Sequence, residues 1–288
     1  MDTTKIGENL FVGQTNALSL IQLWKNNDSF PHFLIISGEA GSGRRTLSYI
    51  FAKELDAQIS IVSDLSVDNV RSVIENSYLI DSKVVYLIPD ADKMSAASKN
   101  SMLKFTEEPP KNAYIIMTLT SLNNTLHTLQ SRSQHIIMSP YTYSELSQLC
   151  NQTRLCKIAT TPGMLKRLES MDNSEVDKLI DTAEKLVDYI NKVSVSNALK
   201  SASCLKFKES DKGIDIDLML ATIDYIINSR LQNMIDKEEI NLELLTRIQC
   251  WSVSLSEWRL KFSYSGVNKR ALYDQCIFQI RNRINSRR

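Results

Sequence analysis

The stretch KNSMLKFTEEPPKNAYIIMTLTSLNNTLHTLQSRSQ, residues 99–134, decides the fold of this chain. It opens with an amphipathic helix, which Pro109 and Pro110 end because proline donates no backbone N–H and its ring clashes inside a helix. The apolar run at 113–119 then has the length and composition of a strand buried on both faces. A further helical turn leaves Arg132 exposed. A buried strand between helices predicts an α/β domain with a parallel sheet.

A glycine-rich loop lies upstream, between another apolar run and another helix. The run FLIIS at 33–37 leads into GEAGSGRRT at 38–46, which contains Gly38, Gly41 and Gly43. Strand, glycine loop and helix form the context of a phosphate-binding P-loop, in which backbone N–H groups at the helix N-terminus surround phosphate oxygens. The sequence therefore predicts a loop with the backbone form of a P-loop.

The residues after this loop depart from those of a P-loop that binds Mg²⁺ and ATP. Such a loop continues with Lys, which contacts the outer phosphates, and with Ser or Thr, which holds the metal. This chain has Arg44 and Arg45 there, and Thr46 comes one residue late, about 100° further round the helix. We expect the loop backbone to be retained and its metal chemistry to be lost. Two interpretations stay open, a tight strand–helix turn without a ligand and a weak nucleotide site.

Residues 99–134 resemble the clamp-loader subunits of the AAA+ class. In that family a helix with Asn-x-Leu-Leu-Lys is followed by Glu-Glu-Pro-Pro, a strand and Ser-Arg-Cys. The corresponding residues here are Asn100, Met102-Leu103-Lys104, Glu107-Glu108-Pro109-Pro110 and Ser131-Arg132-Ser133. Ser133 in place of the cysteine leaves the arginine itself unchanged. The resemblance covers most of residues 8–170 and extends weakly to the C-terminal end.

The resemblance implies roles for single residues. Arg132 would be an arginine finger that acts in trans on ATP held by a neighbouring subunit. Thr120 corresponds to the sensor-1 position, and Asp90 to the catalytic Glu that orients the attacking water. Pro89 replaces the Asp that positions Mg²⁺, and Gly163 replaces the sensor-2 arginine of ATPase relatives. Without the resemblance, a lone surface arginine such as Arg132 is most often solvated or weakly ion-paired.

Three domains are expected from the resemblance and from the composition along the chain. Residues 1–141 would form the AAA+ α/β domain with the degenerate P-loop, and 142–200 a small helical lid. Residues 201–288 would form an all-helical collar through which subunits assemble, since GVNKRAL at 266–272 resembles the family's closing motif. The polar stretch 194–213, rich in Ser and Lys, marks the boundary between lid and collar.

Composition excludes several other classes of protein. The 288 residues carry a formal net charge of +1, so bulk charge does not make the chain a polyanion binder. Its five cysteines are scattered and odd in number, which argues against a disulfide framework or a zinc site, and we predict no metal. The N-terminus lacks a signal-peptide pattern and no apolar run reaches membrane-spanning length, so we expect a cytoplasmic protein without membrane contact.

The function implied by the resemblance is that of a clamp-loader subunit closest to the delta-prime type. Such a subunit does not hydrolyse ATP and sits in a hetero-pentamer that loads a sliding clamp onto primer–template DNA. Binding of ATP or ADP at its own loop is expected to be weak at most. One alternative is an active AAA+ ATPase motor subunit with an unusual P-loop. Another is a stand-alone nucleic-acid-binding AAA+ protein, although a collar has no evident purpose without partners.

Overall fold

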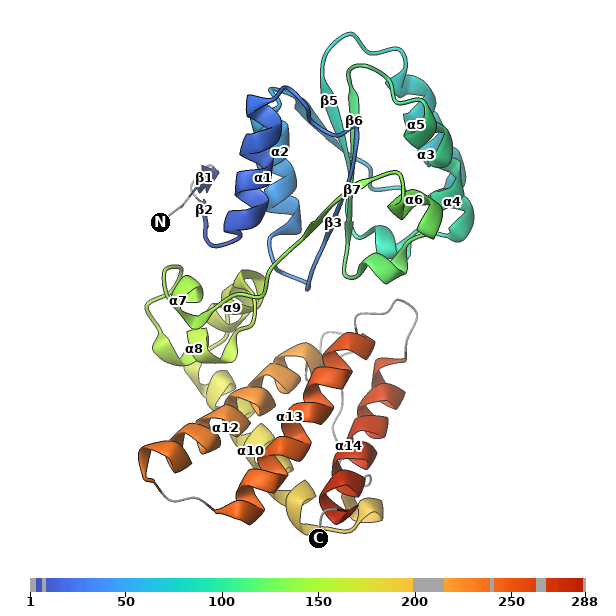
Figure 1. Ribbon diagram of the computed structural model, residues 1–288. Helices are drawn as coiled ribbons and strands as arrows, with labels where there is room; N and C mark the ends of the chain where they lie inside the picture. The colour runs from blue at the N-terminus through green and yellow to red at the C-terminus, as the bar shows by residue number, and fades with distance from the viewer. Residues whose placement is uncertain (1–3, 7–8, 199–214, 239–240, 263–267, 287–288) are drawn as a thin grey trace. The chain divides into compact units, whose positions relative to one another are not determined.

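The computed structural model describes residues 4–6, 9–198, 215–238, 241–262 and 268–286. It divides into two compact units, each considered by itself: unit 1 is Met1–Leu149 with Thr161–Gly163, and unit 2 is Cys150–Thr160 with Met164–Arg288 (Figure 1). The expected boundary between lid and collar, at 200/201, lies outside the described residues, as do Gly266 and Val267 of the expected closing motif. The three-domain division stays a prediction.

Unit 1 is built on a five-stranded parallel sheet, which confirms the predicted α/β class. From one edge to the other, the strands are β4 (Gln58–Ile61), β5 (Val84–Ile88), β6 (Ala113–Leu119), β3 (Phe33–Ser37) and β7 (Gln134–Ile137). Every residue of the central strands β3 and β6 is buried, as their unbroken apolar runs predict. The N-terminal strands β1 (Thr4–Ile6) and β2 (Asn9–Phe11) form a separate antiparallel pair.

Helices cover both faces of this sheet (Figure 1). One face carries α1 (Thr15–Asn26) and α2 (Arg44–Glu54), and the other carries α3 (Val67–Ser77), α4 (Ala96–Ser101), α5 (Leu103–Glu107) and α6 (His127–Gln130). The alternation of side chains along a strand assigns successive β3 residues to opposite faces. Leu34 and Ile36 join the hydrophobic cluster under α1 and α2, whereas Phe33 and Ile35 join the cluster under the other helices.

The helix expected before Pro109 is divided into two short helices. These helices, α4 and α5, meet at Met102, whose backbone keeps right-handed helical angles (φ −78°, ψ −13°). Helix α5 ends at Glu107, and Glu108 leaves the helical region (φ −131°, ψ 73°) immediately before Pro109. The two prolines therefore end the helix as predicted.

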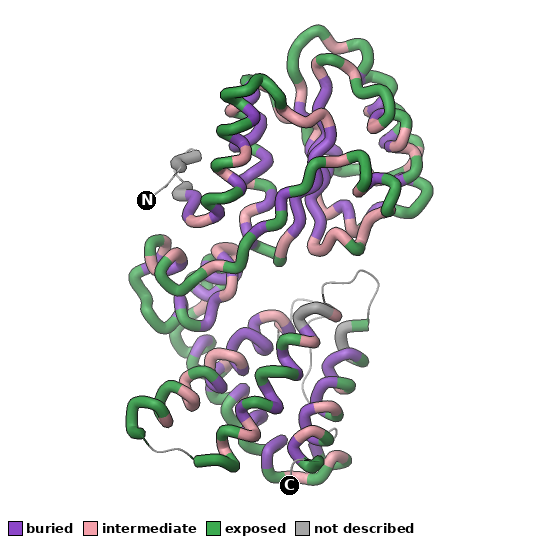
Figure 2. The backbone as a smooth tube through the Cα atoms, viewed as in Figure 1, coloured by how far each residue is buried: buried purple, intermediate pink, exposed green. Residues whose placement is uncertain are grey.

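In the described residues of unit 2, every regular element is a helix. These helices are α8 (Thr153–Ile158), α10 (Asn173–Lys192), α12 (Ile216–Asp236), α13 (Leu242–Phe262) and α14 (Lys269–Ser286), together with α9 (Pro162–Glu169) from Met164 onward; α7 (Tyr143–Leu146) belongs to unit 1. One hydrophobic cluster joins α10, α12, α13 and α14, whose buried residues appear as purple stripes in Figure 2. Within it, the Asn191 side chain accepts a hydrogen bond from Trp251 and the Asn191 carbonyl accepts one from Arg281. Helix α10, expected in the lid, thus shares its core with the expected collar helices.

None of the helices in the described ranges is both long enough and apolar enough to span a lipid bilayer.

Candidate functional site

The glycine loop connects β3 to α2 in unit 1, in the context that the sequence predicts. Gly41 and Gly43 have φ values of +81° and +91°, a left-handed region that residues with a side chain rarely adopt. Gly43 caps α2 without any side-chain hydrogen bond, and the first turn of α2 carries no acidic residue. The first backbone N–H groups of α2 therefore remain available to an anion, as at other helix N-termini.

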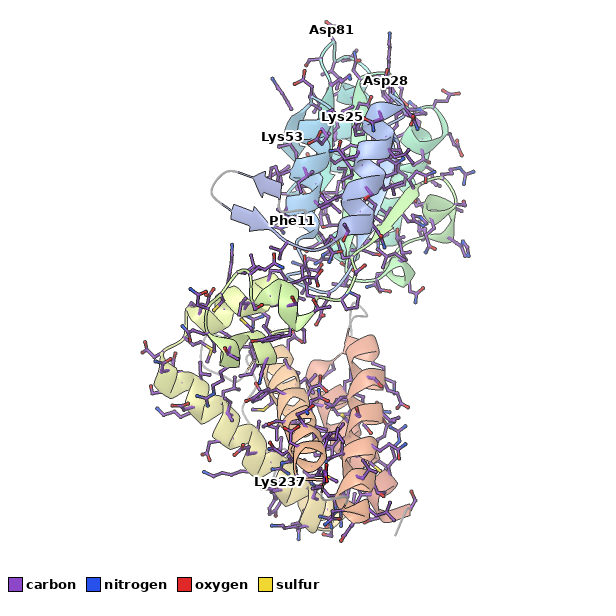
Figure 3. All side chains as sticks on the ribbon, turned by 60° about the vertical axis from the view of Figure 1, so that its left-hand side comes forward. Phe11, Lys25, Asp28, Lys53, Asp81 and Lys237 are labelled. Atoms are coloured by element: carbon purple, nitrogen blue, oxygen red, sulfur yellow. The ribbon has the colours of Figure 1, made fainter. Side chains whose placement is uncertain are left out.

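Neighbouring segments hold the loop through its carbonyl groups. Tyr141 Oη donates a hydrogen bond to the carbonyl oxygen of Ser42 (2.8 Å), and Thr161 Oγ1 donates one to that of Ala40 (3.2 Å). Phe11, at the end of β2 (Figure 3), packs beside the loop, since a Cβ at Gly43 would lie 3.0 Å from its ring. The loop is thus fixed by side chains from both ends of unit 1.

Gly163 and Gly41 touch through their backbones. Gly163 N donates a hydrogen bond of 2.9 Å to Gly41 O, and a Cβ at Gly163 would lie 2.5 Å from the Cα of Gly41. No side chain fits at this position unless the loop moves. An arginine at Gly163, which the resemblance would lead one to expect in an ATPase, would therefore clash with the backbone of Gly41.

Arg44 and Arg45 both face the carboxylate of Asp90. Arg45 Nη2 donates a hydrogen bond of 2.8 Å to Asp90 Oδ2, and Arg44 Nη2 lies 3.6 Å from Asp90 Oδ1. The Arg45 side chain is 59% exposed, whereas that of Arg44 is only 8% exposed. Burial lowers the pKa of Arg44, and the charges of Asp90 and Asp92 oppose that shift. Each oxygen of the predicted water-orienting carboxylate is thus already opposite a guanidinium group.

Two buried polar atoms near the loop have no hydrogen-bond partner. They are Ser42 Oγ and Arg44 Nη1. Such atoms are rare in proteins, because burial without a partner costs roughly 1–3 kcal/mol. Both belong to the predicted phosphate loop, so the loop keeps unused capacity to donate hydrogen bonds. Thr46 is half-buried in the first turn of α2.

Thr120 lies at the end of β6 and is bound to Asp92. The backbone N–H of Thr120 donates to both oxygens of Asp92 (3.1 and 3.0 Å), and Thr120 Oγ1 donates to Oδ1 (2.7 Å). A further hydrogen bond joins the ends of β5 and β6, because the backbone N–H of Asp90 donates to Thr118 Oγ1 (3.0 Å). Of the predicted site residues, the glycine loop, the two arginines and Asp90 come together, whereas Thr120 is held by Asp92.

The sequence assigned no role to Asp92. Its signal is its place in Ala91-Asp92-Lys93-Met94, after an apolar strand, a run that resembles the Ala-Asp-Lys-Met of the clamp-loader family. Within the part of the chain that the structure describes, no group of three or more His, Cys, Asp and Glu side chains gathers as a metal site would require.

Arg132 follows α6 by two residues. Its Nη1 donates a hydrogen bond of 3.0 Å to the carbonyl of Thr128, and its Nη2 lies 3.5 Å from Glu107 Oε1. The side chain is 40% exposed, so this ion pair is largely solvated. Leu129 of α6 packs on the sheet face opposite to α2, which starts at the glycine loop. The structure therefore places Arg132 on a different helix layer from the arginine pair at the loop.

Comparison with known proteins agrees with the motif of residues 99–134. Residues 56–142 match the family model described as "DNA polymerase III, delta subunit". DNA polymerase III subunit delta' of Bacillus subtilis (strain 168) is 33% identical over 92 residues, covering 32% of this chain and 26% of that protein. DNA polymerase III subunit gamma/tau of Mycoplasma pneumoniae (strain ATCC 29342 / M129 / Subtype 1) is 24% identical over 231 residues, covering 68% of this chain and 32% of that protein.

A solved structure of a DNA polymerase III gamma subunit-related protein from Thermotoga maritima is 16% identical and has a TM-score of 0.44, covering 92% of this chain and 99% of that chain. The chain spans only 32% to 42% of the length of the first curated relatives that it matches. The sequence matches confirm the resemblance to clamp-loader subunits of the AAA+ class.

Proposed function

We propose that this chain is a clamp-loader subunit of a replicative DNA polymerase, of the delta-prime type, which does not hydrolyse ATP. In this proposal it offers Arg132 to ATP bound by a neighbouring subunit. Its partners are the other subunits of a hetero-pentamer, a sliding clamp and, through the complex, primer–template DNA. The observation that carries the proposal is the pairing of Asp90 with both Arg44 and Arg45.

This pairing is incompatible with the usual chemistry of ATP hydrolysis. A working site needs a metal ion between the phosphates and a carboxylate that orients water. Here Asp90 Oδ2 already accepts a hydrogen bond of 2.8 Å from Arg45, which competes with the water that this carboxylate would have to orient. Pro89 precedes Asp90 and has no side-chain ligand for Mg²⁺. In this proposal the site therefore lacks two separate parts of the reaction.

The same groups favour weak binding of an anion without a metal. The exposed guanidinium of Arg45 and the unused donors of Arg44 Nη1 and Ser42 Oγ lie together at the loop. Phosphate groups of ATP or ADP match these donors. Such binding would stabilise the subunit without turning nucleotide over.

Arg132 supplies a different part of the reaction. An arginine finger stabilises the charge that develops on the transferring phosphoryl group, and its contribution is about 10³–10⁵-fold in rate. Helices α6 and α2 cover opposite faces of the sheet, so the guanidinium of Arg132 is separated from the chain's own loop. Its exposure and the DNA polymerase III subunits among the relatives support a target on another subunit.

The experiment that tests this role is ATPase measurement on the reconstituted ring, with clamp and primer–template DNA present. Arg132→Ala should lower the rate at least tenfold without loss of assembly, and Arg132→Lys should restore little because lysine lacks the planar fork. Arg154→Ala is the matched control, since Arg154 is also an exposed arginine in an ion pair, with Asp177. A ring containing Arg132→Ala that hydrolyses ATP at the wild-type rate would contradict the proposal.

A further inference from the structure

We propose that Asp92 is a positioning residue for Arg132, because it anchors the segment from which α6 and the arginine project. The inference rests on the function proposed for Arg132. Asp92 itself lies outside this segment, in the short helical turn η1 (Ala91–Lys93) after β5. Three features connect it with the arginine: the hydrogen bonds that its own carboxylate accepts, a buried lysine and a glutamine side chain.

The carboxylate of Asp92, which follows β5, is bound to the end of β6 and to the turn after it. Besides the three hydrogen bonds from Thr120, Asp92 Oδ1 accepts one from Asn124 Nδ2 (2.6 Å). Asn124 Nδ2 also donates to Thr120 Oγ1 (2.9 Å), which closes a triangle of side chains. Asn124 is the last residue of η2 (Leu122–Asn124), so the carboxylate fixes the position of this turn.

A buried lysine holds the same turn from a second side. Lys99 of α4 is 7% exposed, and its Nζ donates a hydrogen bond of 2.5 Å to the carbonyl oxygen of Asn124. Burial lowers the pKa of Lys99, while the negative charge of Asp92 raises it. Asp92 therefore also compensates a buried positive charge, and its neutralisation would leave that charge unbalanced.

A glutamine side chain connects the turn to α6. Gln130 Nε2 donates to the carbonyl oxygens of Leu122 (2.9 Å) and Thr125 (3.3 Å). Gln130 is the last residue of α6, and Arg132 stands two residues further along the chain. The neighbouring Leu129 is fully buried in the hydrophobic cluster. The direction of α6 is thus set by the apolar contacts of Leu126 and Leu129 and by the turn that Asp92 holds.

The intervening segment has little stability of its own. Both η2 and α6 are single turns, and helices this short do not persist without tertiary contacts. An arginine that acts on a phosphoryl group must be held within roughly half an ångström, and a displacement of about 1 Å costs up to ~10²-fold in rate. The Asp92 contacts provide this constraint at the base of the segment that carries Arg132.

The test is Asp92→Asn in the complete reconstituted ring, because asparagine keeps the size of aspartate and removes its charge. We expect kcat of the ring's ATPase to fall about tenfold with KM for ATP unchanged, since the nucleotide is bound by another subunit. The double variant Asp92→Asn with Arg132→Ala should be no slower than Arg132→Ala alone. Asp64→Asn is the control, because the carboxylate of Asp64 accepts two hydrogen bonds from Ser66 outside this network.

The outcomes separate this inference from the proposed function. A normal rate for Asp92→Asn, or a loss that adds to that of Arg132→Ala, overturns the positioning role while the arginine finger stands. Normal rates for both single variants overturn the finger as well. If Asp92→Asn does not fold, Gln130→Ala tests the same link without exposing a buried charge. It should reduce kcat in the same way, and an unchanged kcat for that variant would overturn the inference.

Discussion

The contact between Gly163 and Gly41 makes the effect of one small substitution predictable. Gly163→Ala adds a single Cβ, which would lie 2.5 Å from the Cα and 3.1 Å from the carbonyl oxygen of Gly41. Both are backbone atoms, and Gly41 is held at φ +81° and by its hydrogen bond from Gly163 N, so the loop cannot yield without losing contacts. Overpacking of this kind costs about 1–3 kcal/mol.

An opposite effect comes from helix propensity. Gly163 is the second residue of α9, and replacement of glycine by alanine in a helix interior stabilises by about 0.5–1 kcal/mol. The clash is the larger effect, so we expect a net loss of about 1–2 kcal/mol in the free energy of unfolding. This loss corresponds to a Tm lower by roughly 2–8 °C.

The assay is thermal and urea unfolding of the two proteins, together with amide hydrogen exchange of α2 to locate the loss in unit 1. Hydrogen exchange is needed because a chain with two units need not unfold in one step. Lys53→Ala, an exposed change in α2, should alter stability by less than about 0.5 kcal/mol. A Gly163→Ala protein as stable as the wild type, or more stable, would refute the steric argument.

Three further predictions concern the loop. The purified chain should show no Mg²⁺-dependent ATP hydrolysis in a phosphate-release assay, and turnover near one per second that is lost when Arg44 is changed would contradict this. Calorimetry should detect at most weak ADP or phosphate binding that is unaffected by a chelator, since Arg45 and Pro89 stand where the resemblance implies metal ligands; tighter binding on addition of Mg²⁺ would show that a metal site remains. Burial raises the pKa of Tyr141 from 10.0 to about 12, so its protonated form is favoured by folding. The resulting stability is complete below pH 10 and is lost between pH 10 and about 12, and Tyr141→Phe should remove this part of the alkaline loss in urea unfolding at each pH.

Local signals in the sequence predict the central strands, one helix end and the glycine loop of unit 1. The apolar runs at 33–37 and 113–119 are the two central strands, because only strands covered on both faces are apolar without alternation. Pro109 ends its helix because proline has no backbone N–H to donate and its ring clashes with the preceding turn. The glycine loop follows from residue types that permit positive φ at Gly41 and Gly43.

Contacts between distant residues could not be predicted in this way. The sequence shows Gly163 as a missing arginine, whereas its close approach to Gly41 appears only once the two segments are side by side. Likewise, the resemblance places Thr120 at the sensor-1 position, whereas its bond to Asp92 depends on which strand neighbours β6 and shows only in the fold. The apolar stripe of α10 shows that the helix packs against something, and only the fold shows that α12–α14 are among its partners.

The central claim is that this chain works as a non-hydrolysing member of a clamp-loader ring. Native mass spectrometry of the complex purified through a tag on this chain, with the other clamp-loader subunits of its genome co-expressed, tests that claim most directly. We expect a five-membered hetero-oligomer with this chain beside ATPase subunits, and no ATPase activity when this chain is separated from them. A monomer or homo-oligomer that leaves the other subunits unbound, or one that hydrolyses ATP by itself, would contradict it.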